Sequence, residues 1–136
     1  MSIADYSNGN FALVINGRQI TDFGDTASPF VDAPIDPKRA LRRGQGGNAI
    51  KLERSNPGRM CTLYLNPGSP DSAYMQGLFN SGANISLSRF QVGTLESSIG
   101  TDGVIVNDAA MNRAGTTISD DQYIIEFNGW TGLKGS

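Results

Sequence analysis

Apolar and polar residues alternate over short stretches of this chain, and clusters of Gly, Asn and Ser separate the stretches. The clearest case is "FALVINGRQI", residues 11–20, in which an apolar run meets Asn16-Gly17 and resumes at Ile20. Because Asn-Gly readily takes the positive φ angles of a type I′ turn, these residues predict a β-hairpin.

Two further strands are predicted after residue 48. In "AIKLER", Ile50 and Leu52 alternate with Lys51 and Glu53, so the two apolar side chains are expected to face the core and the charged ones solvent. The turn "NPG" then leads to a return strand, "RMCTLYLN". Three of its residues share the inward face: Cys61, Leu63 and Leu65.

One helix is predicted, at about residues 70–81. Ser69 is a suitable N-cap, Pro70 fits the first helical position, and Asp71 suits the positive end of the helix dipole. Gly82 can end the helix. Four apolar residues fall on one helical face: Tyr74, Met75, Leu78 and Phe79.

The rest of the chain predicts three more strands, "NISLSRFQV", "GVIVNDAAMN" and "DQYIIEFNGW", with "GTDGV" at residues 100–104 interpreted as a turn. In the last of these strands Tyr123, Ile125 and Phe127 are expected to share one face. Residues 21–48 show no sustained period and predict a long inter-strand loop. The expected fold is therefore mainly β, one domain over residues 1–136. It has two packed antiparallel sheets, like a β-sandwich or barrel, with one flanking α-helix.

Composition narrows the class of protein. A chain of 136 residues is the size of one domain. Its single cysteine cannot form an internal disulfide, which fits folding in a reducing cytoplasm. Neither a run of eighteen apolar residues nor a basic-then-apolar leader is found, so neither a membrane span nor a secretion signal is predicted.

The sequence offers little that could carry catalysis. It contains no histidine, the usual general base and the commonest metal ligand. Cys61 lies on the apolar side of a predicted strand and is expected to be a buried structural thiol. The glycine-rich "GQGGNAIK" is not interpreted as a phosphate-binding loop, which needs a lysine and a Ser or Thr after the last glycine at the start of a helix. Here Ala49-Ile50 begin a predicted strand, and Lys51 lies within it. We therefore predict no enzymatic activity, no cofactor and no metal site.

Positive charge is concentrated in one segment. Residues 38–59 hold seven of the eleven Lys and Arg and only one of the thirteen acids, a net charge of +6. The remainder has four basic and twelve acidic residues, a net charge of −8. From these residues alone two interpretations stay open, a solvated basic loop and contact with nucleic-acid phosphates.

The order of these elements resembles that of phage tail tube proteins, the small β-sandwich subunits inside contractile tails. Three phrases carry the resemblance: "SNGNFALVINGRQITDFGD", "GQGGNAIKLERSNPGRMCTLYLNPGSPDSAYMQGLFNSG" and "DQYIIEFNGW". It covers most of the chain in outline, and residues 25–43 depart most from the pattern.

The resemblance implies a structural virion protein of the inner tail tube, made and assembled in the host bacterial cytoplasm. Its partners would be itself, as hexameric rings stacked head to tail, and the tail sheath, baseplate and tail terminator. Double-stranded DNA would pass through the lumen during ejection without specific binding, and no membrane is involved. The alternatives are the tube of a phage-like contractile injection system (a bacteriocin or secretion system) and a monomeric β-sandwich binding module.

The resemblance also implies site residues. The basic stretch would reach an adjacent ring through Lys38, Arg39, Arg42 and Arg43. Acidic residues in predicted turns or strand ends would meet it, the candidates being Asp5, Asp22, Asp25, Asp102, Asp120 and Asp121. A lumen that conducts DNA is expected to have few Lys or Arg, and the lining candidates are Thr62, Ser86, Ser88 and Glu126.

Overall fold

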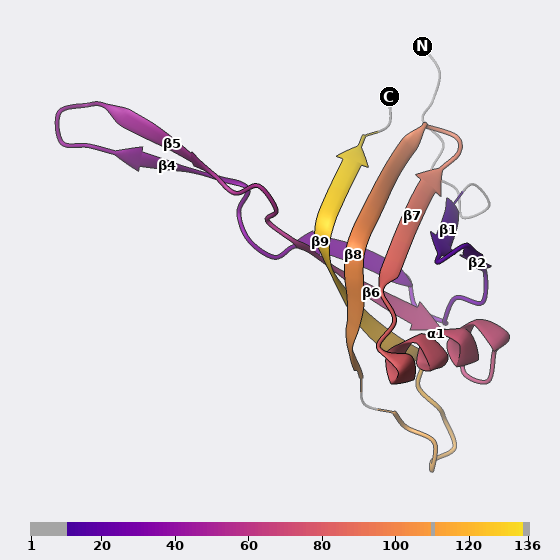
Figure 1. Ribbon diagram of the computed structural model, residues 1–136. Coiled ribbons are helices and arrows are strands. Elements are labelled where there is room, and N and C mark those ends of the chain that lie inside the picture. Colours follow the sequence, from indigo (N-terminus) through magenta and orange to yellow (C-terminus); the bar gives the residue numbers. More distant parts are fainter. Residues whose placement is uncertain (1–10, 110, 135–136) are drawn as a thin grey trace.

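Nine strands and one helix make up the computed structural model, which describes residues 11–109 and 111–134. Seven strands form one antiparallel sheet in the order β2-β1-β7-β8-β9-β6-β3, and β4 pairs with β5 in a second, two-stranded sheet (Figure 1). The strands are β1 (Phe11–Ile15), β2 (Arg18–Ile20), β3 (Phe30–Pro34), β4 (Arg39–Arg43), β5 (Ala49–Glu53), β6 (Arg59–Leu65), β7 (Ile85–Gln91), β8 (Glu96–Asp108) and β9 (Asp121–Leu133).

The large sheet curls until its two ends approach each other. Strands β1 and β3 lie near opposite ends of the strand order, yet the rings of Phe11 in β1 and Phe30 in β3 have centroids 6.2 Å apart. The ring of Phe23 lies 5.8 Å from that of Phe11. Contact between aromatic rings therefore holds the two ends of the sheet together. Within the described part of the chain no hydrogen-bonded ladder joins β2 to β3, so the sheet is not a closed barrel.

The core fills the concave face of this curled sheet. The alternation predicted from the sequence is confirmed for β6 and β9, whose inward residues are almost completely inaccessible to solvent. The buried apolar residues are Leu13, Ile15, Ile20, Cys61, Leu63, Leu65, Met75, Ile85, Leu87, Ile105, Tyr123, Ile125 and Phe127.

The first hairpin, β1–β2, turns at Asn16 and Gly17 as predicted, with φ angles of 50° and 85°. The Asn16 side chain also fixes the turn to the start of β7. Its amide nitrogen donates to the Asn84 carbonyl at 3.0 Å, and its oxygen accepts from the Ser86 backbone N–H at 2.7 Å. The turn is thus favoured by its own residues and also stabilised by hydrogen bonds to the backbone at the start of β7.

The helix α1 spans Pro70–Ser81 and lies across the lower end of the sheet in Figure 1. Ser69 accepts a hydrogen bond from the Ser72 backbone N–H at 3.2 Å, and Gly82 ends the helix in the left-handed conformation, with a φ of 68°. Met75 is buried, and Tyr74, Leu78 and Phe79 pack against the core from partly buried positions. No helix among the described residues is long and apolar enough to cross a membrane.

Asp71 ties the first turn of α1 to the chain that follows β2. Its buried carboxylate accepts hydrogen bonds from Arg18 Nε at 2.9 Å and from the backbone N–H groups of Thr21 and Asp22 at 2.8 and 3.0 Å. Burial alone would raise the pKa of this carboxyl, but the bonds from Thr21, Asp22 and Arg18 outweigh burial and lower it. Asp71 therefore links helix and sheet through its charged form.

The mainly β fold with two antiparallel sheets and one helix is confirmed, but the second sheet does not cover the first. All residues of β4 and β5 are exposed, and the hairpin projects from the body (Figure 1). The expectation that Ile50 and Leu52 face the core of this chain is therefore wrong. The segment expected to be a loop, residues 21–48, contains β3 and β4. Strand β3 lies at the sheet edge, where Pro34 is tolerated.

The predicted turn at residues 100–104 is also wrong, because β8 continues through it. Asp102 has a φ of 53°, and the register between β7 and β8 shifts between the pairs Leu87–Gly100 and Ile85–Gly103. This irregularity is a β-bulge, which bends a strand without ending it. Asp102 consequently lies within a strand rather than at a turn.

Candidate assembly surfaces

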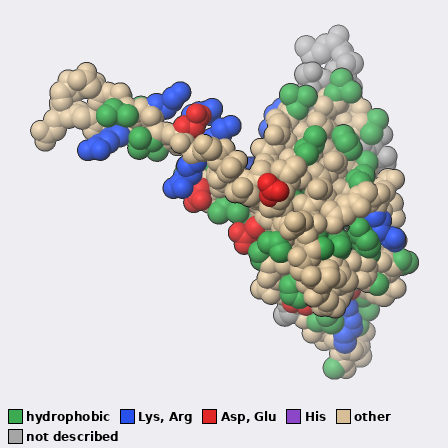
Figure 2. Space-filling model, in the orientation of Figure 1, with side chains coloured by type: hydrophobic (Ala, Val, Ile, Leu, Met, Phe, Trp, Pro, Cys, Tyr) green, Lys and Arg blue, Asp and Glu red, His purple; other side chains and the backbone are tan. Residues whose placement is uncertain are grey.

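The most conspicuous surface feature is the projecting hairpin. We call residues 38–54 the arm; it comprises β4, the turn at residues 44–48 and β5. The Gly44 N–H donates to the Asn48 carbonyl at 2.8 Å, and at the other end the Arg54 N–H donates to the Lys38 carbonyl at 2.8 Å. The arm is thus a hydrogen-bonded ribbon along its whole length, and Figure 2 shows it standing clear of the body.

The two faces of the arm differ in character. Residues paired across an antiparallel ribbon point to the same side, and Arg42 pairs with Ile50 while Ala40 pairs with Leu52. One face therefore carries Ala40, Ile50 and Leu52 together with Arg42, and Ile50 and Leu52 are 57% and 51% exposed. We call this face the apolar face of the arm; it exposes two large aliphatic side chains to solvent.

The arm also carries most of the basic charge. It contains six basic residues and one acid, a net charge of +5. The four residues predicted as contacts, Lys38, Arg39, Arg42 and Arg43, are all exposed. Arg39 pairs with Glu53 at 2.7 Å on the opposite strand. The structure therefore places the predicted basic contacts on one slender projection.

A cluster of two arginines and one aspartate lies where the arm leaves the body. Arg59 Nε donates to Asp32 Oδ1 at 2.9 Å. The Arg59 guanidinium lies over the Trp130 ring, 5.6 Å from its centroid, which is within the distance of about 6 Å at which a cation is attracted to an aromatic ring. Arg89 Nε lies 3.7 Å from Asp32, and its Nη2 donates to Ser98 at 2.7 Å. These contacts line a cleft of about 430 Å³ and fix the first residues of β6 beside β3. Sequence reasoning missed this cluster because its members lie far apart in the chain.

The predicted acidic candidates do not all share one surface. Asp25 and Asp120 come together, since the Asp25 N–H donates to Asp120 Oδ1 at 3.3 Å. Asp22 is half-buried, and its N–H is bound to Asp71. Asp102 is exposed on β8, and Asp5 lies outside the described residues.

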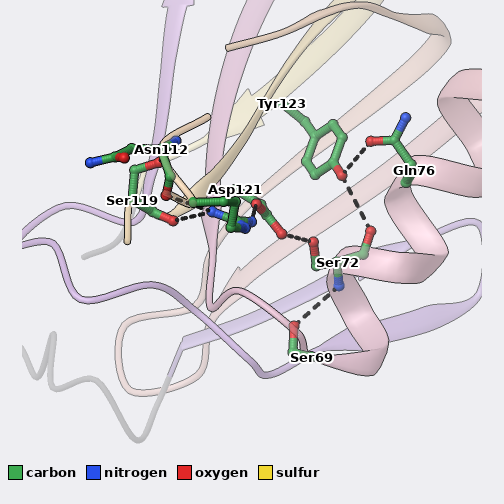
Figure 3. Close-up of polar contacts among 8 residues, drawn as sticks. Ser69, Ser72, Gln76, Asn112, Ser119, Asp121 and Tyr123 are labelled. Carbon is green, nitrogen blue, oxygen red and sulfur yellow. Dashed lines mark hydrogen bonds and ion pairs between the residues drawn. The ribbon is translucent and has the colours of Figure 1, made fainter. Parts of the chain in front are cut away.

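Asp121 is engaged within the chain. Its carboxylate accepts hydrogen bonds from the Ser72 hydroxyl and from Arg113 Nη2 (Figure 3). Nearby, the Tyr123 hydroxyl donates to Gln76 Oε1 at 2.9 Å. Figure 3 shows these groups converging from β9, α1 and the loop before β9. Asp121 therefore holds the helix and that loop on the sheet, and only about a tenth of its side chain is exposed.

A cleft with aromatic walls lies where the ends of the curled sheet meet. We call it the phenylalanine cleft; it has a volume of about 410 Å³, and Phe11, Phe23 and Phe30 line it together with Gly24 and residues 26–29. Asp120 packs directly against Gly24, and Asp25 is exposed between two residues that line the cleft. An apolar hollow with acidic groups at its margin is the result.

The lumen candidates lie on the convex face of the sheet. Thr62, Ser86, Ser88 and Glu126 each alternate with residues buried in the core, so their side chains point away from it. Apolar side chains stand among them, including Met60, Ile99, Val104 and Val106. The outward positions of β6 to β9 contain no Lys or Arg. This face is therefore a mixed, weakly acidic surface.

The described residues offer no site for metal chemistry. Within residues 11–109 and 111–134 no group of three or more His, Cys, Asp or Glu is placed to hold a metal ion. Cys61 is completely buried, and burial, assisted by the negative charge of Asp32, raises the pKa of its thiol to about 12. A thiol with this pKa is a poor nucleophile at neutral pH.

No protein-family model matches the sequence, and no curated protein matches it. Solved structures do match. The chain is similar to the tube-terminating cap of the anti-feeding prophage, with a TM-score of 0.66 and 12% identity over 99% of this chain and 95% of that one. It is similar to a chain of the PVC sheath–tube complex, an extracellular contractile injection system in its extended state, with a TM-score of 0.63 and 12% identity over 95% and 91% of the two chains.

A third match is a chain of the PVC sheath/tube terminator, with a TM-score of 0.59 and 11% identity over 94% of this chain and 96% of that one. At such low identity these likenesses concern the fold. They extend over nearly the whole of each chain, so the resemblance to tail tube proteins is confirmed at the level of the fold.

Proposed function

We propose that this chain is a structural subunit of the inner tube of a contractile tail, in which hexameric rings stack head to tail. The observation that carries the proposal is a fold shared from end to end with components of contractile injection systems. The arm adds a physical reason for assembly, since it exposes apolar side chains and five net positive charges away from the body. A head-to-tail stack needs two different complementary surfaces on each subunit.

In this role the convex face of the curled sheet lines the lumen. A surface without Lys or Arg among its outward positions on β6 to β9 lets DNA pass without the ion pairs that would retain it. The partners would be the sheath, baseplate and terminator of the same tail. The protein would be made in the host bacterial cytoplasm and would end in the virion tail or in an injection machine of phage-like design.

A second candidate is the capping or terminating ring of such a tube. It is favoured by the similarity to the anti-feeding prophage cap and to the PVC terminator. A cap makes one ring, whereas a tube subunit propagates. A sugar-binding module is less favoured, because Trp130, the only tryptophan, packs on Phe127 with ring centroids 5.6 Å apart and lies over Arg59.

The test is light scattering over a range of concentrations, followed by negative-stain electron microscopy. Hollow tubes of uniform width support the tube subunit, and isolated rings support the cap. A chain that stays monomeric at high concentration, and still does so when offered preformed tube ends, would overturn both assignments.

A further inference from the structure

The arm presents a pattern that its own chain leaves unused. The alternation of Ile50 and Leu52 with Lys51 and Glu53 is that of a half-buried strand, yet both apolar residues are more than half exposed. Leu41, on the other face, is exposed as well. Adjacent exposed apolar side chains of this kind mark a site at which another surface packs.

The phenylalanine cleft has the matching chemistry. Its walls are the rings of Phe11, Phe23 and Phe30, and Asp25 and Asp120 lie at its margin. On the apolar face of the arm, Arg42 stands directly across from Ile50. The arm thus offers two apolar side chains beside a cation, and the cleft offers an apolar hollow beside two carboxylates. The two surfaces are complementary in both hydrophobicity and charge.

We propose that the phenylalanine cleft of one subunit receives the apolar face of the arm of a second copy. Ile50 and Leu52 lie against the phenylalanine rings, and Arg42 reaches the carboxylates of Asp25 and Asp120. The inference rests on the proposed function. It adds which surface of the neighbouring subunit receives the arm, which the proposed function does not specify.

The dimensions agree with this arrangement. Alternate residues of a strand are about 7 Å apart, and the three rings have centroid separations of 5.8 and 6.2 Å from Phe11. In Figure 1 the arm extends from one side of the body, and β1, which contributes Phe11 to the cleft, lies on the other side, so the arm points away from the cleft of its own chain. The occupant is therefore a second copy, and each subunit both donates an arm and accepts one.

Two cysteine variants test the contact. Ala40→Cys lies on the apolar face of the arm, paired with Leu52, and Ser28→Cys lies in the exposed lining of the cleft. Both substitutions are small, and the native Cys61 is buried. The two purified variants are mixed, assembled and treated with a short bismaleimide. A cross-linked dimer should form in the mixture, whereas Ala40→Cys mixed with Ser81→Cys, an exposed position at the end of α1, should give none.

An exchange of charges between the two surfaces provides a second test. Arg42→Glu is expected to lower the yield of assembled material about tenfold, since it places like charges against Asp25 and Asp120. Adding Asp25→Arg to the same chain is expected to restore most of that yield. Both residues are exposed, so neither change disturbs the core.

The outcomes separate the inference from the function on which it rests. If the wild-type chain forms rings or tubes but the cleft cysteine gives no cross-link and Asp25→Arg gives no rescue, the receiving surface is elsewhere and the proposed function stands. If the wild-type chain does not assemble at all, the proposed function fails and the inference fails with it.

Discussion

Phe127 of β9 lies directly against Gly103, its cross-strand neighbour in β8. A methyl group on Gly103 would overlap the Phe127 ring, and one on Gly100 would come within 2.9 Å of both Phe127 and Trp130. Two glycines of β8 thus leave the space that two aromatic side chains of β9 occupy. Around Gly100 and Gly103 the core is therefore formed by side chains of adjacent strands in one sheet and not by contact with a second sheet.

Gly103→Ala is expected to lower the free energy of unfolding by about 1–3 kcal/mol, because the added methyl forces the ring or the backbone to move. The midpoint of urea unfolding measures the change. Gly77→Ala is the matched control: Gly77 is exposed in α1 with open space around it, and the change should raise stability by about 1 kcal/mol. Equal stabilities of the two variants would contradict this account of the packing.

Asp71→Asn is expected to lower stability by about 1–3 kcal/mol at neutral pH, because hydrogen bonds to a charged acceptor are replaced by weaker ones. The pKa of Asp71 is lowered on folding, so its charge stabilises the native state above the unfolded pKa, which is about 3.9, and this contribution is lost as the pH falls below it. Unfolding curves between neutral and strongly acidic pH should therefore converge for the wild type and the variant. A difference that stays constant down to the lowest pH would argue against the carboxylate as its source.

The Cys61 thiol is expected to be inert in the native protein. With its pKa raised to about 12 and its side chain fully buried, it should not react with Ellman's reagent at pH 8, because only the thiolate reacts. One thiol per chain should be titrated after denaturation in guanidinium. Rapid labelling of the folded protein would mean that β6 opens readily.

Reversal of the arm charges is expected to block assembly and leave the fold intact. Arg39, Arg42 and Arg43 are exposed, so the triple Glu variant should keep the wild-type circular dichroism spectrum while losing tube or ring formation. Triple Lys substitution preserves charge and serves as the control. Assembly of the wild type should also weaken as salt is added, because exposed charges are screened. Unimpaired assembly of the Glu variant would rule out the arm as a charged contact.

Local signals were enough to predict several elements correctly. Asn16-Gly17 specified a turn, and Ser69 and Gly82 marked the two ends of the helix, because each acts through its own backbone or that of near neighbours. The buried faces of β6 and β9 followed from a period of two. These features depend on few residues that are close in sequence.

Other features depended on partners that the sequence does not place. Strand β3, with its proline, forms only because β6 offers a ladder to it. The meeting of Asp25 with Asp120 joins residues 95 positions apart. The period in β5 correctly predicted a strand, but its apolar face is exposed rather than turned to the core of this chain, because a period of two carries no information about what lies against either face. The predicted roles of the arm and of the convex face remain predictions for the same reason.

The strands β8 and β9 pair along almost their full length, from Ser97–Leu133 to Asp108–Tyr123. One half of this hairpin carries β7 and thereby β1 and β2, and the other half carries β6 and thereby β3. Neither side of the body can open without the hairpin that both share, so the backbone amide hydrogens of the whole body are expected to exchange with solvent in a single cooperative event. The arm shares no strand with the body, and its amide hydrogens can exchange independently, as those of a small autonomous unit.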